Sequence, residues 1–261
     1  MTAKSDQSFR SPGLAPELLV AGPIATITLH RPEMANRLEP EDLATLRGFI
    51  RDVNAQRDVL VLRLCAEGPQ FCAGFNIGRL ADGNAGASFE ALANELEQAR
   101  PVTIAAINGG VYGGATDLAL ACDFRIGVET SQMFVPAARL GLLFYRGGLQ
   151  RYVSRLGLNM AKKLLLTAAT LDAAQMQACG FLDTVVAPDA LRDEVERLSG
   201  ELACMAPLAL LGMKKHLNRI AHGTFDEDEF ARDVAQADAS HDLREAVLAR
   251  KENRKPVFRG E

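Results

Sequence analysis

Tryptophan is absent from this 261-residue sequence, aromatic residues make up only 6%, and no apolar run is long enough to cross a membrane. The longest uncharged stretch, residues 101–116, contains Asn108 and four glycines, whereas a transmembrane helix needs about 20 mostly apolar residues. The N-terminal segment MTAKSDQSFRSPG lacks the apolar core of a signal peptide. We therefore expect a cytoplasmic protein that makes no contact with a membrane.

An excess of positive charge is also missing. The chain has 29 Lys and Arg against 33 Asp and Glu, a formal net charge of −4, so no global basic field attracts nucleic acid. The hydrophobic share of 48% and the charged share of 24% are ordinary for a globular protein and exclude a disordered chain or a fibrous repeat. We expect no nucleic-acid partner.

The motifs of several common enzyme classes are absent. The five cysteines are scattered without a C-x-x-C pair, which indicates buried thiols in a reducing compartment, and the four histidines lack metal-ligand spacing. No G-x-S-x-G, G-x-G-x-x-G or G-x-x-x-x-G-K-[ST] motif occurs, which disfavours serine-hydrolase, hydride-transfer and P-loop chemistry. The sequence therefore predicts neither a metal ion nor a separate cofactor.

The residues that are present divide the chain into three parts. Residues 1–16 are polar with little periodicity, which predicts a flexible lead-in. Residues 17–206 alternate helical patterns with short apolar runs typical of buried strands, at 59–65, 102–107 and 123–128, which predicts an α/β core with crossover connections. Residues 207–261 show helical patterns only, and these helices would pack on another subunit or on their own domain.

Two glycine-bearing turns follow predicted strands, at residues 68–77 and 108–117. Small residues let backbone N–H groups approach a ligand closely, and a helix N-terminus adds unpaired donors. Two such donors aimed at one oxygen would form an oxyanion hole. The spacing alone is equally compatible with two tight turns that have no chemical role.

Several ordered motifs carry a family resemblance. They are F-C-A-G-F-N-I at 71–77, A-A-I-N-G-x-x-x-G-G-x-x-D-L at 105–118, A-C-D-F-R-I at 121–126, the segment 139–151 and the tail 254–258. Together they resemble the crotonase superfamily, also called the enoyl-CoA hydratase/isomerase family, over about residues 17–258. The resemblance implies a spiral of ββα units with a helical C-terminal region. It also implies an acyl-CoA substrate, with coenzyme A as part of that substrate, and a homotrimer or dimer of trimers.

The resemblance also implies site residues. The backbone N–H groups of Phe75 and Gly114 match the two donors that stabilise a thioester enolate in this family. Residues that match segments lining the coenzyme A channel are Arg31, Ala73, Phe75 and Ile77, together with Lys255 and Phe258 in the tail, which commonly reach a neighbouring subunit. For Arg31 and Lys255, a solvated surface charge is an equally open interpretation.

One departure from the family pattern bears on the reaction. Hydratases of this family place a water between two glutamates, and the matching positions here are Asp117 and Ala137. Because alanine cannot transfer a proton, the sequence predicts proton-transfer or lyase chemistry with Asp117 instead of two-glutamate hydration. Asp117 would otherwise only stabilise the N-terminus of its helix.

Other reactions remain open. Tyr145 and Arg146 lie in a segment that supplies active-site residues in several family branches, and Arg146 could bind the carboxylate of a malonyl-type thioester. The alternatives are therefore a decarboxylase or a non-catalytic paralogue that binds coenzyme A or RNA, and the net charge disfavours RNA. A dehalogenase-like reaction lacks a nucleophilic aspartate near Arg146.

Overall fold

The computed structural model of the protein describes residues 13–79 and 85–261, with residues 85–87 described by their backbone only. Its larger sheet has an antiparallel outer pair and is otherwise parallel. In spatial order its six strands are β1 (Glu17–Ala21), β2 (Ile24–Leu29), β3 (Val61–Ala66), β5 (Val102–Ile107), β7 (Phe124–Val128) and β10 (Thr184–Val186). Every residue of β5 is buried, as its continuous apolar run predicts.

A second, smaller sheet has two of its strands within the segments that the sequence indicated as turns. Its strands are β4 (Gln70–Cys72), β6 (Gly110–Tyr112), β8 (Gln132–Phe134) and β9 (Leu171–Asp172), in that spatial order. The first three run parallel, and β9 is antiparallel to β8. Strands of two or three residues are too short to show an alternating pattern, which is why the sequence did not reveal this sheet.

Helices follow the strand pairs in a regular order. The helices of the described residues are α1 (Pro40–Ala55), α2 (Ala85–Glu97), α3 (Gly114–Ala121), α4 (Arg146–Thr167), α5 (Ala173–Ala178), α6 (Leu191–Ala203), α7 (Pro207–His222), α8 (Glu227–Ala239) and α9 (His241–Lys251). The units β1-β2-α1, β3-β4-α2, β5-β6-α3 and β7-β8-α4 repeat the expected ββα order. The prediction of an α/β spiral is confirmed.

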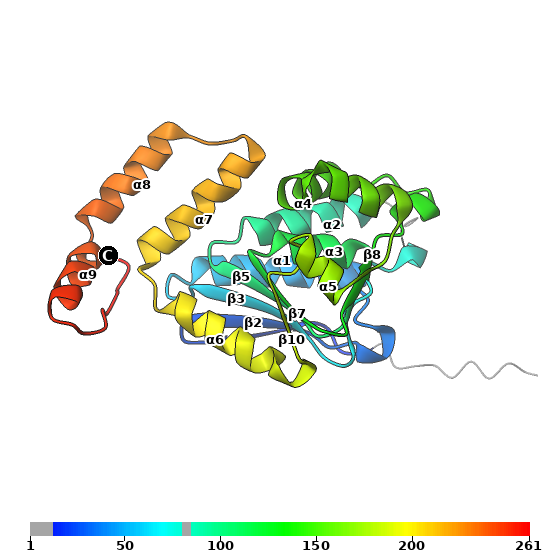
Figure 1. Cartoon of the computed structure of the whole chain (residues 1–261), viewed down its shortest axis with the longest axis horizontal. Coiled ribbons are helices and arrows are strands. Elements are labelled where there is room, and N and C mark those ends of the chain that lie inside the picture. The colour runs from blue at the N-terminus through cyan, green and yellow to red at the C-terminus, as the bar shows by residue number, and fades with distance from the viewer. Residues whose placement is uncertain (1–12, 80–84) are drawn as a thin grey trace, which may run out of the picture.

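The helices cover the larger sheet on both faces. In Figure 1, α1, α2 and α3 lie on one face and α6 lies on the other. The larger apolar cluster fills the space under α1 to α4, and a second cluster joins Leu191, Val195 and Leu202 of α6 to the opposite face of the sheet. The N-terminus of α3, just after β5 and β6, is therefore held in the middle of the packed body.

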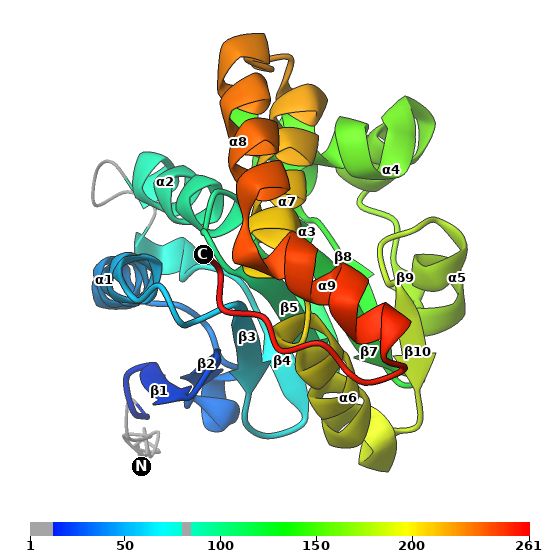
Figure 2. The same cartoon turned by 90° about the vertical axis from the view of Figure 1, so that its left-hand side faces the viewer.

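Residues 207–261, here called the arm, extend away from this body in Figure 1 and lie in front of it in Figure 2. Helix α7 contacts the body through Lys214, whose Nζ donates to the Pro101 carbonyl at 2.6 Å and pairs with Asp123 at 2.7 Å. Helix α8 has no buried residue. Of the two arrangements left open by the sequence, packing on the body thus holds for α7.

The lead-in predicted at 1–16 lies mostly outside the described residues. Of its described part, the Leu14 N–H donates to the His30 carbonyl at 3.2 Å. No helix within residues 13–79 and 85–261 combines the length and the apolar character needed to cross a bilayer.

Candidate active site

The two glycine turns meet in space. Gly74 has a φ of 84°, and a Cβ atom built on it would lie 2.7 Å from the Tyr112 carbonyl oxygen and 3.0 Å from the Gly114 nitrogen. Such distances are closer than packed atoms allow, so only glycine lets the segment after β4 lie against the start of α3. This contact brings the predicted donor residues Phe75 and Gly114 side by side.

The peptide groups around Phe75 fix the direction of its N–H. Leu38 pairs with Phe75 in a parallel bridge, in which the Leu38 N–H donates to the Gly74 carbonyl at 2.8 Å and the Asn76 N–H donates to the Leu38 carbonyl at 3.0 Å. In such a bridge the N–H of the central residue points away from the partner strand. The Phe75 N–H is therefore directed away from Leu38.

Gly114 is the first residue of α3, so its N–H has no acceptor within the helix. Gly113 before it has φ 55° and ψ −127° and donates its own N–H to the Phe134 carbonyl at 3.0 Å. Within the described part of the chain, the structure records no acceptor for the N–H of Phe75 or of Gly114. Two adjacent unpaired donors, one of them at a helix N-terminus, can stabilise a negatively charged oxygen.

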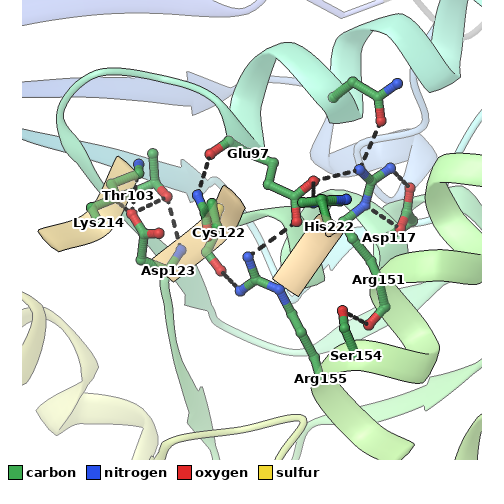
Figure 3. Close-up of polar contacts among 12 residues, drawn as sticks. Glu97, Thr103, Asp117, Cys122, Asp123, Arg151, Ser154, Arg155, Lys214 and His222 are labelled. Carbon is green, nitrogen blue, oxygen red and sulfur yellow. Dashed lines mark hydrogen bonds and ion pairs between the residues drawn. The ribbon is translucent and has the colours of Figure 1, made fainter. Parts of the chain in front are cut away.

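Asp117, one turn further along α3, is fully buried and paired. Arg151 of α4 donates to both carboxylate oxygens, from Nε to Oδ1 at 2.9 Å and from Nη2 to Oδ2 at 2.7 Å, and the Tyr145 hydroxyl donates to Oδ2 at 2.6 Å. Figure 3 shows the Asp117–Arg151 pair. Proton transfer by Asp117 would first have to disturb this ion pair, a constraint that the sequence did not reveal.

Arg151 continues the charge network toward the arm. Its Nη1 donates to Glu97 at 3.0 Å, and Glu97 also accepts from Arg155 at 3.3 Å and contacts the His222 Nε2 at 3.0 Å (Figure 3). Burial alone would lower the pKa of Arg151, but the carboxylates of Asp117 and Glu97 raise it, so the guanidinium is charged. No local sequence signal marks this role of Arg151 and Glu97, because a buried ion pair forms between residues that are far apart in the chain.

Tyr145 and Arg146 lie at the start of α4. Burial and the neighbouring Asp117 carboxylate raise the pKa of Tyr145 well above its ordinary value, so the phenol keeps its proton and donates it in the hydrogen bond to Asp117. Arg146, the next residue, is exposed. A fixed phenol and an exposed guanidinium are therefore adjacent in the chain at the N-terminus of α4.

An aromatic side chain from α2 completes the surroundings of the donors. The Phe89 ring lies so close to Gly114 that a Cβ atom built there would be 2.8 Å from its Cζ. The ring centroid of Phe89 is 6.3 Å from that of Phe75, edge to face, and 6.2 Å from that of Tyr145.

The remaining predicted residues fall into two groups. Ala73, Ala137 and Arg31 are buried or partly buried, whereas Ile77 is exposed and Lys255 and Phe258 lie in the tail. Ala73 adjoins the donor segment. Ala137 is buried, and its methyl side chain provides an apolar surface. Arg31 is largely buried and pairs with Asp42, which differs from a solvated surface charge.

Ile77 is half exposed, with 54% of its surface accessible. Lys255 and Phe258 lie in the tail after α9, which Figure 1 draws in red on the arm. Within one chain the structure does not bring this tail to the start of α3.

Comparison with known proteins shows the family of this chain. The family model described as enoyl-CoA hydratase/isomerase matches residues 20–261, nearly the whole chain. The chain belongs to the enoyl-CoA hydratase/isomerase family. It is therefore an acyl-CoA enzyme of the crotonase superfamily, and the resemblance seen in the motifs is confirmed.

Individual relatives support the assignment. The chain is 31% identical over 252 residues to the putative enoyl-CoA hydratase/isomerase YngF of Bacillus subtilis, covering 91% of this chain and 95% of that protein. It is 30% identical over 205 residues to the short-chain-enoyl-CoA hydratase of Clostridium acetobutylicum, covering 76% and 78%. The structure of enoyl-CoA hydratase subunit I from Geobacillus kaustophilus superposes with a TM-score of 0.85 at 28% identity, covering 96% and 100%.

Proposed function

We propose that this family member forms a thioester enolate on an acyl-CoA, with the oxyanion held by the N–H groups of Phe75 and Gly114. Support comes from the close approach of the two segments at Gly74 and from the absence of recorded acceptors for these donors within the described residues. Preorganised donors of this kind stabilise charge that develops on a carbonyl oxygen during reaction.

The proposed reaction differs from carboxylate-catalysed hydration. Ala137 carries no acid, and both oxygens of Asp117 already accept hydrogen bonds from Arg151 or Tyr145. This engagement of Asp117 is the observation that carries the proposal. A water placed between these two positions would lack the pair of free carboxylates that activates it.

Decarboxylation of a malonyl-type thioester is the reaction that this arrangement favours. The bond between Cα and the carboxylate breaks, its electrons enter the thioester carbonyl to form the enolate, and carbon dioxide leaves without a general base. A proton from solvent water then adds to Cα in place of the lost carboxylate, which gives the shortened acyl-CoA and hydroxide. The exposed Arg146 beside Tyr145 is available to bind the substrate carboxylate. Proton transfer that involves Tyr145 and Asp117 is the second candidate, because these two side chains lie near the donors and share a 2.6 Å hydrogen bond.

An acyl-CoA panel tests this proposal. The protein is incubated with malonyl-CoA, methylmalonyl-CoA and crotonyl-CoA, and products are measured by mass spectrometry. We expect decarboxylation of a malonyl-type thioester, with crotonyl-CoA hydration at least about 10²-fold slower, because one missing acid–base group typically costs that much. Hydration as the fastest reaction would contradict the proposal.

Gly114→Pro tests the donor within the same panel. Proline removes the N–H at position 114, and the first position of a helix tolerates proline. The residue before a proline has to be extended, and the φ and ψ of Gly113 are the mirror image of an extended conformation, which glycine can adopt before proline. Gly114→Ala is the matched control, because either substitution adds a Cβ that meets Phe89. Turnover of the proline variant should be about 10²-fold below that of the alanine variant. Equal turnover would remove Gly114 from the proposed site.

We also infer that the chain assembles as a homotrimer or a dimer of trimers through the arm. Met213, Leu217 and Ile220 lie on one face of α7 at i, i+4 and i+7 and remain about 60% exposed. An apolar stripe with this spacing suits burial against another helix or sheet. A neighbouring copy would then be the source of the tail residues Lys255 and Phe258 for the coenzyme A channel.

A further inference from the structure

Phe89 occupies a constrained position beside the donor pair. Three atoms of its ring, Cζ, Cε1 and Cε2, would lie 2.8, 3.0 and 3.2 Å from a Cβ atom on Gly114. The outer edge of the ring therefore covers the Cα of the residue that carries one donor. No methyl group fits between Phe89 and Gly114 unless the ring moves.

The ring cannot move freely, because other side chains hold it. Phe89 is only 3% exposed and packs edge to face on Phe75, which carries the other donor. On the α4 side it contacts Tyr145, whose hydroxyl is fixed on Asp117 and whose ring stacks on Phe144 with centroids 4.7 Å apart. The charge network behind Asp117 thus keeps Tyr145, and through it Phe89, in place.

Other parts of the chain also pack against the donor pair. The Gly74 backbone lies against Tyr112 and Gly114, Leu38 is bonded to the strand behind Phe75, and Pro136 lies near Gly113. An acyl group whose carbonyl oxygen reaches both donors would extend along the aromatic side chains next to them, Phe75, Phe89 and Tyr145.

We propose that Phe89 sets the acyl-chain length, so that the site accepts short-chain acyl-CoA thioesters and excludes long, straight chains. The proposal rests on the proposed function, because it assumes that the acyl carbonyl is bound at Phe75 and Gly114. Chain length is selected by the ring itself: a longer chain meets Phe89 and has to displace it from Phe75 and Tyr145. Each methylene that a pocket admits or rejects typically changes binding about 10-fold or more.

Binding of unreactive saturated thioesters tests this inference without relying on the reaction. Butanoyl-CoA, octanoyl-CoA and free coenzyme A are titrated by calorimetry into the full-length wild-type protein and into Phe89→Leu and Phe89→Ala. Wild type should prefer butanoyl-CoA over octanoyl-CoA by about 10-fold or more. Phe89→Ala should reverse or abolish this preference, and the milder Phe89→Leu, which is less disruptive to folding, should reduce it.

Leu92→Ala is the matched control. Leu92 lies on the same helix and is 1% exposed, but it faces the interior apolar cluster beside Leu38, Phe71 and Leu118. Its truncation should lower stability without changing the ratio of the two affinities. Thermal unfolding of every variant separates loss of folding from loss of selectivity.

The outcomes are distinct. A wild type that binds octanoyl-CoA as tightly as butanoyl-CoA overturns the chain-length inference and leaves the proposed function standing. An unchanged ratio in both folded Phe89 variants, or an equal shift in Leu92→Ala, also overturns it. A wild type that binds the thioesters no better than free coenzyme A overturns the proposed acyl site, and the inference with it.

Discussion

The body and the arm of this molecule place charged and apolar side chains in opposite ways: the body buries charged groups, and the arm exposes apolar ones. In the body around α3, charged groups are buried and matched, as in the contact of Arg151 with Asp117 and Glu97. On the arm, apolar side chains such as Leu217 and Val247 are exposed, each with 65% of its surface accessible. The donor geometry is therefore determined inside the body, whereas the arm presents a surface suited to a contact outside the single chain.

Buried and surface ion pairs also differ in how much each contributes to the stability of the fold. Asp117 and Arg151 have essentially no exposed side-chain surface, so losing one partner leaves an uncompensated charge in the interior. Arg197 on the solvent side of α6 pairs with Glu194 and Glu201 while it is half exposed. Water screens such a surface pair, and its contribution to stability is small.

Arg151→Met should produce the largest loss of stability. It removes the partner of two buried carboxylates at roughly constant side-chain volume, and breaking a buried pair typically costs about 3–5 kcal/mol. Chemical denaturation measures this change in the free energy of unfolding. The matched control, Arg197→Met, should cost less than about 1 kcal/mol.

A double variant sharpens this test. Adding Asp117→Asn to Arg151→Met removes the charge left unpaired in α3 and should recover part of the lost stability, because the amide is cheaper to bury than a carboxylate. If the loss of unfolding free energy in the double variant equals the sum of the losses in the two single variants, the pair is energetically uncoupled. That result would break the contrast drawn between the body and the surface.

Leu217→Lys should change assembly instead of folding. A charge in the exposed stripe of α7 opposes burial against another copy, so the mass measured by sedimentation should fall toward that of the monomer. The unfolding temperature of the body should change little at matched monomer content. The control is Leu19→Lys on β1, a leucine that is similarly exposed at 66% and lies away from the arm. If both variants keep the wild-type mass, or if the wild type is itself a monomer, the arm is not the assembly surface.

The smallest expected effect is a loosening of the tail in acid. Hydrogen bonds from Arg254 and from the Val257 N–H lower the pKa of Glu245 to about 2. A carboxylate with a lowered pKa contributes stability above its unfolded pKa of about 4.3 and loses it as the pH falls toward 2. Hydrogen exchange at Val257, corrected for the intrinsic rate, should therefore increase between pH 5 and pH 3. In Glu245→Gln this added dependence on pH should disappear; if it persists, Glu245 is not its source.

Much of the fold could be predicted because its signals are local. The apolar run at β5 agrees with the expectation, since strand burial depends on residues close in sequence. The strands β4, β6 and β8 escaped prediction because three residues carry too little pattern. The helices of the arm were expected as helices, while their placement was left open because it depends on surfaces from elsewhere in the chain.

The sequence by itself determined the family, the ββα order and the glycines that let two backbone segments touch. Only the tertiary structure decided that the Asp117 carboxylate is paired with Arg151, 34 residues away, and that Phe89 covers Gly114. The physical reason is that local propensities act over a few residues, whereas a buried ion pair or a ring contact forms only when packing brings distant side chains into one interior.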